Sequence, residues 1–226
     1  MTIQKIVSVI TLSAALLKGS MDVAMPDKNV EGTLFLVNRD HPIVESYIPA
    51  VRTVEVTGMK QAMNDEAATA LEQMFAAAKA EKVGLSSVSG YRSYAKQETI
   101  YARKKGKNGK ATADSLVALP GSSEHQLGMA MDLAQKGGSQ LNSGFGKTKA
   151  GIWISENAWR YGFIVRYPSG KESITGYAYE PWHVRYVGKE YAAAVRSLGE
   201  PLEIYVSAHR LELYSVLMKQ TNEVLP

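Results

Sequence analysis

The chain has 226 residues, of which 45% are hydrophobic and 21% charged, so it is long enough for one large domain or two small ones with ordinary cores. This composition excludes a largely disordered chain, a collagen-like repeat and a polytopic membrane protein. The net charge of +4 comes without a basic motif and does not indicate a nucleic-acid partner. Because the sequence contains no cysteine, any metal must be held by His, Asp or Glu.

Residues 1–25 are predicted to be a signal-like or anchoring segment. Lys5 precedes an apolar run over residues 6–17, which is shorter than the ~20 residues that a membrane-spanning helix needs. Lys18 and Asp22 stand where a cleavage site would have small neutral residues, so a buried or amphipathic helix is the alternative. We expect a single domain over residues 26–226.

The domain is predicted to begin with a short buried strand at residues 32–37, followed by a turn at 38–42. Asn64 or Asp65 is expected to cap a helix that runs to about Glu81, because apolar residues recur there at helical spacing. This helix would be part of the core scaffold.

A strand at 85–90 and a second helix at 93–105 are predicted next. Residues 103–118 are rich in Lys and Gly and show no periodicity, so we expect a long exposed loop there. Segment 128–134 has strand character, with Ala130 and Asp132 on one face.

The remaining chain alternates irregularly between expected loops, helices and strands. We expect a loop at 137–149, a helix at 152–161, strands at 162–167 and about 182–186, and helices from 189 and at 211–217. Without a regular strand-helix-strand alternation, the pattern indicates an α+β fold with a central, largely antiparallel sheet flanked by helices.

Two of the four histidines stand beside carboxylates. His125 and Asp132 occur in SSEHQLGMAMD, and Glu180 and His183 enclose EPWH. Two neutral imidazoles and one carboxylate make a three-ligand zinc set whose fourth position is open to water, as in catalytic sites. The carboxylate left over, Glu180, would then be the general base.

These two stretches closely resemble the paired motifs SxHxxGxAxD and ExxH of the LAS metallopeptidases, the family of lysostaphin, D-alanyl-D-alanine metallopeptidases and sonic hedgehog. The matching residues are Ser123, His125, Gly128, Ala130, Asp132, Glu180 and His183. Within that family the chain resembles the VanY-like carboxypeptidases over about residues 32–198, and SGYRSYAKQ at 89–97 looks like their SGYRSxxxQ segment. The resemblance implies an LAS/hedgehog-type domain with Zn²⁺ as cofactor.

The same resemblance implies that Arg92, Gln97 and Ser123 cradle the free C-terminal carboxylate of the substrate. Arg92 lies between a predicted strand and the start of a helix, where unpaired backbone N–H groups already favour an anion. A guanidinium there can bind a carboxylate bidentately. An exopeptidase needs such a clamp, and an endopeptidase does not.

The activity implied is that of a D,D-carboxypeptidase, which removes the C-terminal D-alanine from peptidoglycan stem peptides. The protein would then act outside the cytoplasm, secreted or membrane-anchored at the bacterial cell wall, with no nucleic acid and no obligate protein partner. The alternatives are an L,D-carboxypeptidase acting on tetrapeptide stems, an endolysin, and a non-catalytic zinc-stabilised module that binds the cell wall. Arg92 and Gln97 argue against the endolysin, and Glu180 argues against the module.

Overall fold

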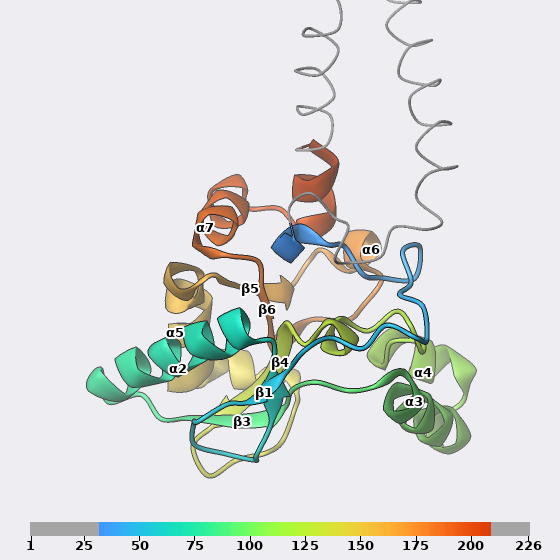
Figure 1. The fold of residues 1–226 in the computed structure, drawn as a ribbon, viewed down its shortest axis with the longest axis horizontal. Helices are drawn as coiled ribbons and strands as arrows, with labels where there is room; N and C mark the ends of the chain where they lie inside the picture. The colour runs from blue at the N-terminus through green and yellow to red at the C-terminus, as the bar shows by residue number, and fades with distance from the viewer. Residues whose placement is uncertain (1–31, 209–226) are drawn as a thin grey trace, which may run out of the picture.

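A four-stranded antiparallel sheet lies at the centre of the computed structural model, which describes residues 32–208 (Figure 1). The strand order is β3 (Leu85–Ser89), β4 (Ala130–Gln135), β6 (Glu180–Tyr186) and β5 (Phe163–Tyr167). A separate two-stranded sheet pairs β1 (Arg52–Thr53) with β2 (Ala62–Met63). The predicted α+β class is confirmed, and so are the four strands of the central sheet.

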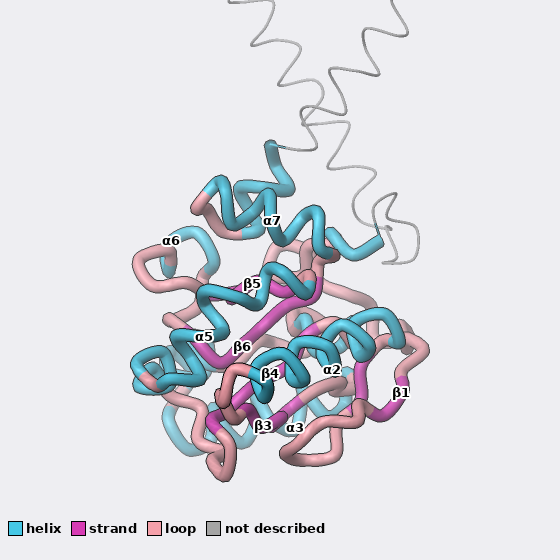
Figure 2. The backbone as a smooth tube through the Cα atoms, turned by 90° about the vertical axis from the view of Figure 1, so that its left-hand side faces the viewer, coloured by secondary structure: helices cyan, strands magenta, loops and turns pink. Residues whose placement is uncertain are grey.

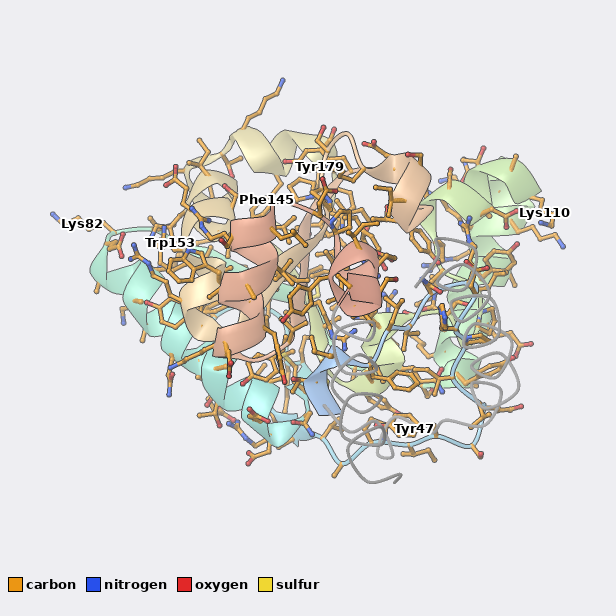
Figure 3. All side chains as sticks on the ribbon, turned by 90° about the horizontal axis from the view of Figure 1, so that it is seen from above. Tyr47, Lys82, Lys110, Phe145, Trp153 and Tyr179 are labelled. Carbon is orange, nitrogen blue, oxygen red and sulfur yellow. The ribbon has the colours of Figure 1, made fainter. Side chains whose placement is uncertain are left out.

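Helices α2 (Asp65–Ala80) and α5 (Lys149–Asn157) lie together on one side of the sheet (Figure 2). As predicted, Asn64 caps α2, and its side chain accepts a hydrogen bond from the backbone N–H of Glu66. Apolar side chains from both helices share one buried cluster with the sheet. In Figure 3, Phe145 and Trp153 lie within the molecule, whereas Lys82 and Lys110 project from its opposite ends.

The segment predicted as a long loop at 103–118 is helical instead. Helix α3 (Tyr94–Asn108) continues past the predicted end, and α4 (Lys110–Leu116) follows after Gly109, whose φ of 79° separates the two helices. Within residues 103–118 only Ala113 is buried, so this part of the sequence shows no apolar periodicity. Figure 1 shows α3 and α4 on the side of the sheet away from α2 and α5.

The strand predicted at 32–37 is also wrong. The segment starts with a 3-10 turn, η2 (Gly32–Leu34), and residues 35–37 belong to no strand of the described chain. The apolar run is nevertheless buried, because it covers the core. Two of its carbonyl groups, those of Thr33 and Phe35, accept hydrogen bonds from the Arg185 side chain.

The C-terminal half follows the prediction with local changes. The loop expected at 137–149 contains a 3-10 turn, η4 (Ser143–Lys147), and the helix expected at 152–161 divides into α5 and the 3-10 turn η5 (Ala158–Tyr161). A short helix, α6 (Glu172–Thr175), was not predicted.

The chain continues from β6 into α7 (Lys189–Leu198), as expected, and residues 202–208 are also helical. The helix predicted at 211–217 and the segment at 1–25 lie outside the described residues. Within residues 32–208 no helix is both long enough and apolar enough to span a membrane.

Gly128 is required at the turn that leads from His125 into β4. It has a φ of 72°, its N–H donates to the His125 carbonyl, and a Cβ there would lie 2.9 Å from Val51 Cγ1. We expect Gly128→Ala to lower the free energy of unfolding by about 1–3 kcal/mol, measured by urea denaturation. Gly137→Ala is the matched control, because Gly137 has a similar φ of 81° but open space around the added methyl group. An equal loss in both variants would contradict the importance of the close approach at Gly128.

Candidate metal centre and substrate pocket

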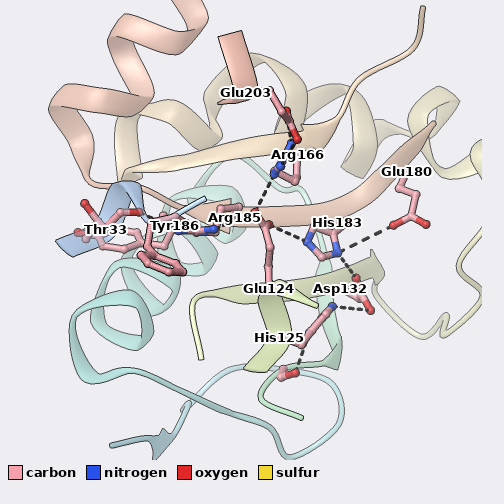
Figure 4. Close-up of polar contacts among 12 residues, drawn as sticks. Thr33, Glu124, His125, Asp132, Arg166, Glu180, His183, Arg185, Tyr186 and Glu203 are labelled. Carbon is pink, nitrogen blue, oxygen red and sulfur yellow. Dashed lines mark hydrogen bonds and ion pairs between the residues drawn. The ribbon is translucent and has the colours of Figure 1, made fainter. Parts of the chain in front are cut away.

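Three potential metal ligands meet where β4 and β6 pair. Asp132 on β4 stands directly opposite His183 on β6, and His125 comes from the 3-10 turn η3 (Glu124–Leu127) that precedes β4. One donor atom from each of the three lies within 4.8 Å of the others, and all three side chains are buried (Figure 4). The antiparallel pairing of β4 with β6 therefore brings Asp132 and His183 together although they are far apart in the sequence.

The spacing of these donor atoms fits zinc. His125 Nε2 lies 3.4 Å from Asp132 Oδ2, and His183 Nδ1 lies 3.1 Å from Asp132 Oδ1. Ligands about 2.0–2.1 Å from a tetrahedral zinc ion are separated by about 3.3 Å. The two measured distances, which end on different oxygens of Asp132, are close to that separation.

Hydrogen bonds orient the two imidazoles. His125 Nδ1 lies 2.7 Å from the Gly90 carbonyl oxygen, so this nitrogen donates and Nε2 is left buried without a hydrogen-bond partner. Burial and the nearby Arg92 charge lower the pKa of His125 to about 4, so the ring is neutral at pH 7. An unpartnered, neutral imidazole nitrogen is the state that binds zinc.

His183 lies between two carboxylates. Burial alone would lower its pKa, but hydrogen bonds to Asp132 and Glu124 raise it to about 9 in the metal-free protein. Burial would raise the pKa of Asp132, but the protonated His183 holds it well below its usual range. Zinc binding would therefore displace a proton from His183 Nδ1.

Glu180 stands beside the ligand group at the start of β6. Its Oε2 lies 3.9 Å from His183 Nδ1, and burial raises the pKa of the carboxyl group to about 7. A general base is most effective when its pKa lies near the working pH. The position and the pKa both fit the predicted role of Glu180.

The three residues predicted to bind a carboxylate line the same pocket of about 260 Å³ as the ligand group. The other lining residues are Lys104, Leu116, Val117, Ala118, Glu124, Leu141, Tyr167, Tyr177, Glu180 and Trp182. Residues of α3 and α4 thus form one wall of the pocket, and the strands form the other. The structure brings all seven predicted site residues together.

Arg92 and Lys104 are the permanent cations that line this pocket. The Nε of Arg92 is buried without a hydrogen-bond partner, and no ion pair to Arg92 occurs among residues 32–208. Burial lowers the pKa of Arg92, while the charges of Asp132 and Glu180 oppose that shift. An unpaired guanidinium in a pocket is a strong site for an incoming anion.

Gln97 has fewer hydrogen-bonding groups available for a ligand than the sequence suggests. Its Nε2 already donates to the Ala118 carbonyl at 2.7 Å, so one amide hydrogen remains for a ligand. Its Oε1 is buried without a partner.

Sequence reasoning missed a buried ionic cluster behind the ligands. Glu124 accepts hydrogen bonds from Arg166 and Arg185, and these arginines hold the pKa of its carboxyl group well below its usual range even though burial opposes them. Tyr167 was also missed, and its ring packs 5.0 Å from the His183 ring. Glu124 stands next to His125 in the sequence, but nothing there indicates that two distant arginines meet it.

Comparison with known proteins identifies relatives of this chain. Residues 60–189 match a family model described as VanY, D-alanyl-D-alanine carboxypeptidase. A D-alanyl-D-alanine carboxypeptidase of Enterococcus faecalis is 38% identical to this chain, and the alignment covers 80% of this chain and 68% of the relative.

Two solved structures are similar over most of the described residues. The LD-carboxypeptidase LdcB is 43% identical, with a TM-score of 0.74, over 78% of this chain and 86% of its own. A mutant of the vancomycin-resistance D,D-pentapeptidase VanY, in complex with Zn(II), is 36% identical, with a TM-score of 0.68, over 77% of this chain and 98% of its own.

Proposed function

We propose that this chain, which belongs to the VanY family of zinc-dependent carboxypeptidases, is a D,D-carboxypeptidase. In this proposal it removes the C-terminal D-alanine from pentapeptide stems of peptidoglycan. The observation that carries this proposal is the unpaired guanidinium of Arg92, whose Nε is buried, in the same pocket as the ligand group. A cation at a fixed distance from the reacting centre selects a peptide with a free C-terminal carboxylate.

The residues have separate roles in the proposed reaction. Zinc, when held by His125, Asp132 and His183, supplies a Lewis acid that makes water a nucleophile near neutral pH. Glu180 takes a proton from the attacking water and later gives it to the amine of the leaving D-alanine.

Arg92, Gln97 and Ser123 hold the terminal carboxylate, which fixes the register of the peptide. This places the penultimate carbonyl carbon beside the ligand group. The same register excludes bonds within the stem, because those lack a carboxylate at the required position.

An L,D-carboxypeptidase that shortens tetrapeptide stems is the second candidate. The observation that favours it is the similarity to LdcB, at 43% identity and a TM-score of 0.74. Both reactions release D-alanine and use a carboxylate clamp, so they differ only in the residue on the N-terminal side of the cleaved bond.

Peptidoglycan stems lie outside the cytoplasm, so we place the site of action there, at the bacterial cell wall. The predicted partners remain the stem peptides, with no nucleic acid or obligate protein partner.

Product analysis by mass spectrometry tests the function. Purified protein is incubated with muropeptides that end in L-Lys-D-Ala-D-Ala or in L-Lys-D-Ala, with and without a chelator. We expect the pentapeptide to lose one alanine, the tetrapeptide to persist, and chelation to abolish the loss until zinc is added back.

Other outcomes would redirect the assignment. Loss of alanine from the tetrapeptide would establish the L,D-carboxypeptidase instead. Stoichiometric zinc without cleavage of either peptide would contradict both reactions and favour a binding module.

A further inference from the structure

We propose that Glu124 is a positioning residue that holds His183 in the tautomer with hydrogen on Nε2, so that Nδ1 is free to bind the metal. The proposal rests on the zinc site of the proposed function and adds to it a residue that is not among the three proposed metal ligands. Glu124, His183 and the two arginines form the centre of the cluster in Figure 4.

The two oxygens of Glu124 have different partners. Oε1 accepts hydrogen bonds from Arg166 Nε at 2.7 Å and from Arg185 Nη1 at 2.8 Å. Oε2 faces His183 Nε2 at 3.4 Å. Because an ionised carboxylate can only accept, the hydrogen of this contact must belong to the imidazole.

The opposite side of the His183 ring faces the metal group. Nδ1 lies 3.1 Å from Asp132 Oδ1, and the ring is 4% exposed, so water has little access to either nitrogen. A neutral imidazole carries one hydrogen, and when Glu124 keeps it on Nε2, Nδ1 presents its lone pair to the metal.

Each arginine is fixed by a further contact, so the carboxylate of Glu124 cannot turn. Arg166 binds Glu203 bidentately, with Nη1 and Nη2 at 2.9 and 2.6 Å from its two oxygens. Arg185 Nη2 donates to the carbonyls of Thr33 and Phe35, each at 2.8 Å. Two segments near the ends of the described chain, residues 32–37 and 202–208, thus hold the carboxylate that orients His183.

Glutamine at position 124 has nearly the same shape but opposite polarity toward His183. Its amide oxygen can keep the two arginines, which leaves the NH₂ group facing His183 Nε2. That amide can only donate, so Nε2 must become the acceptor and the imidazole hydrogen must move to Nδ1. Glu124→Gln should therefore block the metal-binding nitrogen without removing any metal ligand.

Two measurements without substrate test the proposal. Competition with a chromophoric chelator gives the zinc affinity, and we expect Glu124→Gln to weaken it about 10–100-fold. Glu203→Gln is the control, because it removes a charge from the same cluster at Arg166 but leaves the Glu124 carboxylate facing His183, so its zinc affinity should fall much less than that of Glu124→Gln. Equal losses of zinc affinity in the two variants would show a general structural effect and overturn the proposal.

The second measurement uses the wild-type protein and so does not depend on the folding of a variant. Long-range ¹⁵N–¹H NMR of the zinc-loaded, ¹⁵N-histidine-labelled protein should show the His183 hydrogen on Nε2. A hydrogen on Nδ1 would overturn the proposal. If Glu124→Gln weakens zinc binding more than Glu203→Gln does, but the wild type cleaves no muropeptide, the proposed function fails and the role of Glu124 stands.

Discussion

Replacement of Glu180 with glutamine should lower kcat for release of D-alanine by about 10²–10⁴-fold, the usual contribution of a general base. The amide keeps the shape of the side chain but cannot accept a proton from water. Zinc content should be unchanged, because Glu180 lies outside the ligand group, with its Oε2 3.9 Å from His183 Nδ1. Steady-state kinetics and metal analysis of the same preparation check both statements.

Glu156→Gln is a suitable control, since Glu156 is an exposed carboxylate on α5 far from the pocket. It should match the wild type in kcat and in zinc content. If Glu180→Gln kept the wild-type kcat, Glu180 would not be the base. If that variant lost zinc, Glu180 would act on the metal site itself.

The parts of the fold that the sequence predicts well are those whose apolar pattern faces the core. Helix α2 carries Leu71 and Met74 at helical spacing and has a polar cap at Asn64, so its bounds are readable from local residues. Strands β4 and β5 contain short apolar stretches next to turns, whereas β3 and β6 carry more polar residues and were still predicted near their observed positions.

Prediction fails where a segment does not follow that pattern. Helix α3 was predicted to residue 105, but its last turn and α4 were expected to form a loop, because lysines and glycines occur there without apolar periodicity. Both helices nevertheless contribute residues to the pocket. Residues 32–37 show the opposite error, because burial without a neighbouring strand looks the same in sequence as burial within a sheet. In both cases the outcome depends on tertiary contacts that no local pattern contains.

The candidate site divides in the same way. The grouping of His125, Asp132 and His183 was predicted from residue types that suit zinc and from the resemblance of the two motifs, and the structure brings the three together. The role of Glu180 as the base stays a prediction. The role of Glu124 was not predicted, since it depends on side chains that stand 42 and 61 residues away along the chain. Motifs mark the atoms that react, whereas the groups that orient them are found only in the folded structure.

Replacement of Arg92 with alanine should reduce kcat/KM for the free-acid peptide by at least about 30-fold, because truncating one partner of a buried charge pair costs about 2–5 kcal/mol. The matched substrate is the same peptide with a C-terminal amide. The wild type should strongly prefer the acid, since the amide offers Arg92 no negative charge. Arg92→Ala should lose that preference, so its kcat/KM values for acid and amide should converge.

Stability separates this role from a structural one. Arg92 has no ion pair among residues 32–208 and a buried Nε without a partner, so its removal should leave the free energy of unfolding unchanged or raise it. Arg52 provides the contrast, because it pairs with Asp65 and Glu72 at the surface. Arg52→Ala should lower the free energy of unfolding by up to about 1 kcal/mol and leave kcat/KM unchanged.

Arg92→Ala should therefore change kcat/KM but not lower the free energy of unfolding, whereas Arg52→Ala should lower the free energy of unfolding but not change kcat/KM. Urea denaturation and the acid-to-amide ratio of kcat/KM, measured on both, give the comparison. A variant of Arg92 that unfolds more easily and still prefers the acid would show that this guanidinium stabilises the fold and that another group recognises the carboxylate. A variant with wild-type stability and no preference between the two peptides would place the recognition at Arg92, because no structural loss could then account for the change.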